Sequence, residues 1–213
     1  MDAFIIPRTK FPSPAPALTD EELITRFQQG AEEAFVMLVR RFKNPLTNFV
    51  YRLLGELDDA DDIVQETFLR VYSHRHSYNP VAKFSTWLYR IALNLATSAL
   101  RRETRKRRYL KDGMLAGFAL TRADREAYDS EMPVDSQVDT TITLQLVQKA
   151  LMQISPVFRE VIVLRDIQGL TYEEIAGITG LELGTIKSRI SRGRSHLQKL
   201  LKDIYRNEEG DPR

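Results

Sequence analysis

Apolar residues recur at helical spacing along the chain, and no segment alternates between apolar and polar residues as a half-buried strand would. One apolar stripe follows Ser85 and comprises Leu88, Ile91, Ala92, Leu95 and Ala99. A second stripe, nearer the C-terminus, comprises Leu144, Val147, Ala150, Leu151 and Ile154. Stripes of this kind are typical of amphipathic helices that bury one side, so the sequence predicts an all-α fold.

Capping and breaking residues predict where the first helices begin and end. Thr19 and Glu22 form a capping-box pattern, in which each side chain can bond to the other residue's backbone N–H. Three helical segments are expected from there to about residue 73, with breaks at Gly30, Pro45 and Gly55. Residues 74–83 are expected to form a loop that leads into a long helix, which Ser85 can cap.

The chain is expected to contain two helical domains joined by an acidic, flexible linker, the C-terminal one a helix-turn-helix. The predicted parts are a Pro-rich tail (1–17), a first domain (18–108), the linker (109–139), a second domain (140–206) and a short tail (207–213). Within the second domain, Ser155 and Pro156 are expected to begin a helix that ends near Gly169.

Charge is unevenly distributed, although the net charge is only +2. Residues 101–108 read RRETRKRR, and residues 183–202 contain no carboxylate, whereas acids concentrate in 58–66 and 124–139. Separate basic and acidic surfaces suit a chain that holds a polyanion and a basic protein together, although solvated helix faces would give the same pattern. The absence of cysteine excludes disulfides and thiolate metal sites. No secretory signal or membrane-length apolar run is present, so we expect a cytoplasmic chain without membrane insertion.

The segment TYEEIAGITGLELGTIKSRISRGR carries the most specific motif, a helix-turn-helix. Gly180 falls at the turn, where a left-handed backbone is favoured, and small Ala176 before it permits a close helix crossing. Leu181, Ile186 and Ile190 are expected to anchor the second helix. Its other face presents Thr185, Lys187, Ser188, Arg189 and Arg192. Such a face suits the major groove of duplex DNA, where arginine reaches base edges and hydroxyls bond to phosphates.

The first domain has two candidate binding faces. On one predicted helix, the face comprises Asp58, Asp62, Gln65 and Glu66, together with an apolar Leu69 expected to be exposed. Acids around an exposed leucine favour a docking surface for a basic protein helix, the alternative being a solvated face. On the next helix, Trp87, Arg90 and Asn94 lie opposite the apolar stripe, after a loop that contains Tyr78, Asn79, Lys83 and Phe84. Aromatic and basic residues together favour single-stranded nucleic acid, unless the aromatics merely cover neighbouring helices.

These motifs, DDIVQETFLRVY, FSTWLYRIALN and LTYEEIAGITGLELGTIKSRISRGR, resemble in order and spacing the extracytoplasmic-function sigma factors of bacterial RNA polymerase. The resemblance covers roughly residues 19–205. It implies that the acidic face contacts the clamp coiled coil of the polymerase largest subunit, and that the linker lies near the polymerase active centre. It also implies that residues 78–84, with Trp87 and Asn94, capture the unpaired −10 strand. Lys187, Ser188, Ser191 and Arg192 match the positions that recognise the −35 duplex, although Ser191 is smaller than its counterpart in some relatives. Members are commonly inhibited by a partner anti-sigma factor.

Two other functions are compatible with parts of the sequence. An autonomous helix-turn-helix regulator would bind promoter DNA as a symmetric dimer, with residues 19–108 as a sensor or dimerisation domain. An enzyme acting on nucleic acid would need clustered acids or a base beside a nucleophile. His74 and His76 point to different faces and His196 stands alone, so no catalytic, metal or cofactor site is expected.

Overall fold

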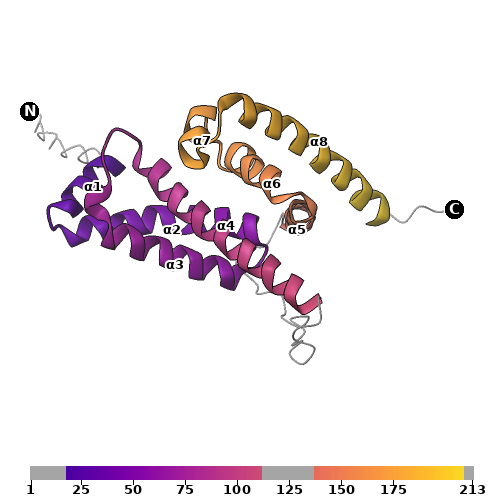
Figure 1. The fold of residues 1–213 in the computed structure, drawn as a ribbon, viewed down its shortest axis with the longest axis horizontal. Coiled ribbons are helices and arrows are strands. Elements are labelled where there is room, and N and C mark those ends of the chain that lie inside the picture. Colours follow the sequence, from indigo (N-terminus) through magenta and orange to yellow (C-terminus); the bar gives the residue numbers. More distant parts are fainter. Residues whose placement is uncertain (1–17, 112–136, 209–213) are drawn as a thin grey trace, which may run out of the picture.

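The computed structural model describes residues 18–111 and 137–208, which form helices and no strand. An N-terminal domain comprises α1 (Asp20–Gln28), α2 (Glu32–Leu54), α3 (Leu57–Ser73), the short η1 (Arg75–Ser77) and α4 (Phe84–Lys111). A C-terminal domain comprises α5 (Gln137–Gln153), α6 (Pro156–Ile162), η2 (Val163–Ile167), α7 (Tyr172–Thr179) and α8 (Leu183–Glu208). The predicted all-α, two-domain architecture is confirmed (Figure 1).

The N-terminal domain is a bundle in which α1, α3 and α4 pack around α2. Its core includes Phe27, Leu38, Phe49 and Leu88, which are fully buried. The predicted capping box at Thr19 is confirmed, because the Thr19 side chain accepts from the Glu22 N–H while the Glu22 carboxylate accepts from the Thr19 N–H. The left-handed backbone of Gly55 (φ 90°) then turns the chain from α2 into α3.

The predicted break at Pro45 is wrong, because this proline lies inside α2. A proline in a helix removes one backbone hydrogen bond and crowds the preceding turn. Here Leu38, Leu46 and Phe49 are buried on both sides of it, while Pro45 itself is exposed. Packing of this apolar face therefore keeps the helix continuous across a residue that would disrupt it in isolation.

The start of α4 also differs from the prediction. Ser85 is the second residue of the helix rather than its cap. The Phe84 N–H instead donates to Oε1 of Glu21, 3.0 Å away on α1. A carboxylate at a helix N-terminus satisfies an unpaired donor and complements the helix dipole. The loop before α4 is further fixed by the Gln28 side chain, whose Nε2 donates to the carbonyls of Arg75 (2.7 Å) and Tyr78 (3.0 Å).

In the C-terminal domain, the second apolar stripe is only partly as predicted. Leu144 is exposed rather than buried, whereas Leu146 and Gln148 are buried. The face of α5 is rotated because it packs against α2 of the first domain as well as against α8. Ser155 occupies the N-cap of α6 and Pro156 its first position, as predicted, although the Ser155 side chain makes no capping hydrogen bond.

The predicted linker is shortened from both ends, since α4 continues to Lys111 and α5 begins at Gln137. Its remaining residues, 112–136, lie outside the described part of the chain, as do residues 1–17 and 209–213. The predictions of a Pro-rich unfolded tail, an acidic flexible linker and a linker near the polymerase active centre concern those residues. Figure 1 shows the C-terminal domain lying alongside the N-terminal bundle, and α7 is the helix that packs against α4.

Candidate protein-docking and nucleic-acid interface

An apolar groove of about 400 Å³ runs between α2 and α3. It is lined by Phe35, Val39, Lys43, Val64, Gln65, Phe68, Leu69 and Tyr72. Leu69 is 62% exposed at its edge, as the sequence predicted. The Phe35 ring packs edge-on against Phe68 and Tyr72, with centroids 6.4 and 5.3 Å apart, so aromatic packing supports the floor.

Acidic side chains lie beside the groove-lining face of α3, because Asp62 and Glu66 precede the lining residues Gln65 and Leu69 by three positions, about one helical turn. Asp58 and Asp62 are exposed, and Glu66 is half-exposed. Glu66 accepts from Nε of Arg70 at 2.8 Å, an intrahelical pair that the sequence analysis did not anticipate. An apolar groove with an acidic border suits a helix that presents apolar and basic side chains together. The contribution of α2 was missed, although Phe35 and Val39 lie four residues apart, the spacing of neighbours on one helix face.

The aromatic residues near the start of α4 form a packed cluster, whose members differ in exposure, rather than an open pocket. Tyr78 and Phe84 are buried, with 5% and 0% exposure, and therefore lie within the core, where they do not line a surface pocket. Trp87 is half-buried, with its ring 5.4 Å from that of Tyr78 and 6.1 Å from that of Phe84. The Tyr78 hydroxyl donates to the Ala82 carbonyl at 2.7 Å, which closes the loop. Trp87 is thus the one member of this cluster with a partly accessible ring.

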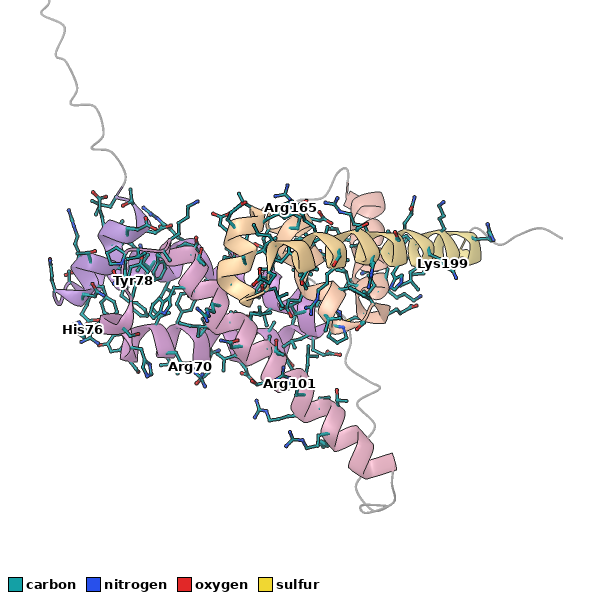
Figure 2. The ribbon with its side chains drawn as sticks, turned by 45° about the horizontal axis from the view of Figure 1, so that its top comes forward. Arg70, His76, Tyr78, Arg101, Arg165 and Lys199 are labelled. Carbon is teal, nitrogen blue, oxygen red and sulfur yellow. The ribbon has the colours of Figure 1, made fainter. Side chains whose placement is uncertain are left out.

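Burial affects the chemistry of this cluster. It raises the pKa of the Tyr78 hydroxyl, and the nearby carboxylates of Glu21 and Asp20 raise it further. Tyr78 therefore stays neutral and donates its hydrogen bond. The remaining predicted −10 residues, Asn79, Lys83, Arg90 and Asn94, are exposed. The arrangement offers one supported aromatic surface beside cations and amides, as single-stranded DNA requires. Figure 2 labels Tyr78 within the N-terminal domain.

Trp87→Ala should weaken capture of an unpaired strand more than binding to duplex. One base stacked on an aromatic contributes ~1–3 kcal/mol, so a tenfold loss or more in strand capture is expected. The measurement is fluorescence of a base analogue placed in the −10 element, beside gel-shift binding to a −35 duplex. Equal losses in both assays would show that Trp87 only supports the fold.

The helix-turn-helix is confirmed as predicted. Thr171 and Glu174 form the second capping box, and Gly180 adopts a left-handed backbone (φ 72°) between α7 and α8. Ile186 and Ile190 are buried. Gly193 allows α8 to cross α6 closely, because a Cβ there would lie 2.6 Å from Cδ1 of Ile162.

The predicted −35 residues lie along α8 and differ in exposure. Lys187, Ser188, Ser191 and Arg192 are exposed, whereas Thr185 and Arg189 are half-buried. The cationic stretch of α8 continues to Lys199, which Figure 2 places toward the far end of the helix. One side of the helix therefore presents both cations and hydroxyls to solvent.

Two further residues, which the sequence analysis missed, organise the helix-turn-helix. The Tyr172 ring lies 4.9 Å from the Arg165 guanidinium and 5.9 Å from the Lys187 ammonium, so it orients both cations. Arg194 makes an ion pair with Asp166, whose hydrogen bonds raise the pKa of the Arg194 guanidinium. Arg194 is thus held by the protein, whereas Arg192 has no partner among the described residues. Figure 2 shows Arg165 at the outer edge of the C-terminal domain.

Glu160 on α6 is a half-buried carboxylate. Burial raises its pKa, while the charges of Arg189 and Arg101 act in the opposite direction. The folded chain therefore binds the Glu160 proton more tightly than the unfolded chain does. The free energy of unfolding therefore falls as the pH rises from the pKa of Glu160 in the unfolded chain to its higher pKa in the folded chain.

Glu160→Gln should consequently raise the melting temperature by a few degrees at about pH 7.5, and by less at about pH 4. Thermal unfolding followed by circular dichroism at both pH values measures this. Asp203→Asn, which neutralises an exposed carboxylate on α8, serves as the control. A gain that is equal at both pH values would contradict the assigned cause.

No cluster of three or more potential metal ligands occurs among residues 18–111 and 137–208. Within the same residues, no helix has the length and hydropathy needed to cross a membrane.

Comparisons with known proteins identify the family of each domain. Residues 38–106 match the Sigma-70 region 2 family and residues 144–197 match the Sigma-70 region 4 family. The chain is 36% identical over 182 residues to the ECF RNA polymerase sigma factor SigW of Bacillus subtilis (strain 168), covering 85% of this chain and 96% of that protein.

Two solved structures have a similar fold over most of the chain. CnrH, in complex with the cytosolic domain of CnrY, is 27% identical with a TM-score of 0.63, covering 86% of this chain and 97% of that one. The sigma factor RpoE of Bartonella quintana, in complex with the anti-sigma factor NepR, is 31% identical with a TM-score of 0.60, covering 79% and 96%.

The N-terminal helical domain matches region 2 and the helix-turn-helix domain matches region 4, in that order, so the chain is a transcription initiation factor of the sigma-70 class. Within that class, the chain belongs to the extracytoplasmic-function (ECF) RNA polymerase sigma factors. Both domains match sigma factors in the same order, which favours this identification over an autonomous dimeric regulator. Its function is to direct promoter-specific initiation by RNA polymerase.

Proposed function

We propose that this sigma factor docks on the clamp coiled coil of the polymerase largest subunit through the groove between α2 and α3. Asp58, Asp62, Gln65, Glu66 and Leu69 would make this contact. The supporting observation is the exposed Leu69 beside an apolar groove with an acidic border. A helix face that is merely solvated does not need an apolar groove. A large exposed apolar side chain beside such a groove is typical of a docking site.

Promoter recognition is divided between the two domains. The solvent-facing side of α8 would bind the −35 duplex. Its residues are the exposed Lys187, Ser188, Ser191 and Arg192 and the half-buried Thr185 and Arg189. Asn79, Lys83, Trp87, Arg90 and Asn94 would bind the unpaired −10 strand, supported from beneath by Tyr78 and Phe84. Separating one base step costs ~1.4 kcal/mol, and one stacked base returns ~1–3 kcal/mol. One accessible tryptophan therefore offsets about one step, so strand opening depends on the polymerase.

The chain would act by binding alone, in the cytoplasm, and would supply no catalytic group of its own. An anti-sigma factor is a further expected partner. The structure of RpoE contains the anti-sigma factor NepR, and the structure of CnrH contains the cytosolic domain of a second protein, CnrY. Such a partner would compete with polymerase for the same exposed surfaces.

Run-off transcription with purified polymerase core and genomic promoter fragments tests the proposal. Addition of the chain should produce discrete transcripts that core alone does not make. The chain by itself should bind the same fragments only weakly. Tight binding to a palindromic site without polymerase would instead support the autonomous regulator.

A further inference from the structure

The loop between η1 and α4 carries part of the candidate −10 surface. Residues 79–83 are all exposed, and Val81 is 91% exposed. Binding to a loop is weakened when its backbone has to be ordered in the bound state, and it is strengthened when the protein fixes that backbone beforehand. The contacts that hold this loop in the free chain therefore affect how well it captures an unpaired strand.

The start of the loop is held by Gln28, the last residue of α1. Nε2 of Gln28 donates to the Arg75 carbonyl at 2.7 Å and to the Tyr78 carbonyl at 3.0 Å. The neighbouring Phe27 of α1 adds a second contact, because the Arg75 guanidinium lies 5.1 Å from the centre of its ring. Two carbonyls, one in η1 and one just after it, thus converge on a single amide group, which fixes the path of the chain into the loop.

The end of the loop is held by Glu21, in the first turn of α1. Its Oε1 accepts from the Phe84 N–H at 3.0 Å, and Phe84 is the first residue of α4. This carboxylate satisfies a donor that the helix itself leaves unpaired, and it complements the helix dipole. Glu21 therefore fixes where α4 begins, and with it the position of Trp87, which lies in the first turn.

Glu21 and Gln28 lie on the same face of α1. They are seven residues apart, which at 3.6 residues per turn places them ~20° from each other around the helix and ~10 Å apart along it. One rigid helix face thus sets the spacing between the two ends of the loop. Figure 1 shows α1 at the end of the bundle where this loop lies. This helix precedes residues 38–106, the segment that matches Sigma-70 region 2.

The contacts from α1 are made to the backbone of the chain. By contrast, the C-terminal domain reaches the loop through the end of a long side chain, since the Lys83 ammonium lies 2.7 Å from Oε1 of Glu174. A lysine side chain has several rotatable bonds, so an ion pair at its tip restrains the backbone little. The path of the loop is therefore set from α1 and by the internal bond from the Tyr78 hydroxyl to the Ala82 carbonyl.

We propose that Glu21 and Gln28 are positioning residues for recognition of the unpaired −10 strand. Neither side chain is assigned a contact with DNA. Both act through the backbone of the loop and the first turn of α4, which present Asn79 and Trp87. The inference rests on the proposed function for the identity of the bound strand, and it adds α1 to the elements on which recognition of that strand depends.

Glu21→Ala and Gln28→Met test this inference, because each removes a contact to the loop and introduces a good helix former. Holoenzyme made with each variant is titrated with a fork fragment of a promoter found by run-off transcription. In this fragment the −35 element is duplex, and the −10 strand is unpaired and carries a fluorescent base analogue. Capture of the strand should weaken about tenfold in each variant, because the loop then has to be ordered on binding. Affinity for a −35 duplex alone should stay within about twofold.

Two further variants separate positioning from a general effect on folding. Glu21→Gln should restore most of the capture, because its amide oxygen can still accept from the Phe84 N–H. Glu22→Ala breaks the capping box of the same helix, in which Oε2 of Glu22 accepts from the Thr19 N–H at 2.8 Å, and leaves both contacts to the loop in place. It should lower the melting temperature and leave capture unchanged.

The ratio of affinities for the preferred −10 strand and for one with a single base replaced gives a second readout. Partial unfolding lowers both affinities equally and leaves this ratio unchanged, whereas a misplaced loop lowers the ratio. The ratio should therefore fall in Glu21→Ala and Gln28→Met, and it should not fall in Glu22→Ala. Hydrogen exchange of the Phe84 amide in the free chain should become faster in Glu21→Ala and stay slow in Glu21→Gln.

Unchanged capture in a folded Glu21→Ala chain would overturn the inference. An equal loss in Glu22→Ala, or an unchanged affinity ratio in both loop-contact variants, would also overturn it by reducing the role of α1 to stability. If instead holoenzyme with the unmodified chain fails to capture the −10 strand, the proposed function is wrong.

Discussion

Replacing Asp62 by lysine and Leu69 by serine should lower the affinity of the chain for RNA polymerase core by about 30-fold or more. Leu69 is the most exposed large apolar residue of the groove, and losing a side chain that is fully buried by a partner costs about 2 kcal/mol. Reversing the charge at Asp62 adds repulsion toward a basic partner. Because both side chains are exposed, the fold should survive. Affinity can be measured by fluorescence anisotropy of the labelled chain titrated with core.

A matched control lies on the same helix. Leu57→Ser removes a leucine that is 43% exposed on α3 but does not line the groove. This variant should bind core like the unmodified chain. Equal losses in the two variants would indicate a general effect of α3 on stability, and unchanged binding of the Asp62/Leu69 variant would remove the docking surface from α3.

The local features of the fold could be predicted from the sequence. Both capping boxes, the left-handed glycine between α7 and α8 and the exposed Leu69 depend on residues a few positions apart. Their geometry is set by backbone hydrogen bonds and helical periodicity, which a short segment contains in full. The helix-turn-helix was therefore predicted almost residue by residue.

Features that depend on distant contacts could not be predicted in this way. The stripe on α4 accounts for Leu88 and Ala92, but Tyr89, Leu93 and Ala96 are buried as well. The helix is buried on more than one side because α7, far along the chain, packs on it. Periodicity within α4 does not show which additional face a second domain will cover.

The candidate −10 site shows the same limit at the level of single residues. An aromatic side chain in a loop suits either a base-binding pocket or a hydrophobic core. Tyr78 and Phe84 belong to the core because Gln28 and Glu21 of α1 hold the loop and the start of α4 in place. Only the tertiary structure separates these supporting residues from Trp87, whose ring is partly accessible.

Arg192→Ala should weaken binding to the preferred −35 element and relax the choice of base at one position. An arginine that bonds to both acceptors of a guanine contributes ~1–3 kcal/mol of discrimination, which corresponds to about 5–150-fold in affinity. Arg192 is exposed on α8 and has no partner among the described residues, so its guanidinium is available for such a contact. The measurement uses holoenzyme and a set of promoters with each −35 base replaced in turn.

Arg194 provides the matched comparison, since it lies two residues away on the same helix and carries the same charge. Its guanidinium is held by Asp166, with 3.0 Å between Nε and Oδ2. Arg194→Ala should therefore leave the base preferences unchanged, because the side chain is occupied within the protein. If Arg192→Ala instead weakens binding to every promoter equally, Arg192 contacts phosphate, and base recognition must come from its neighbours on α8.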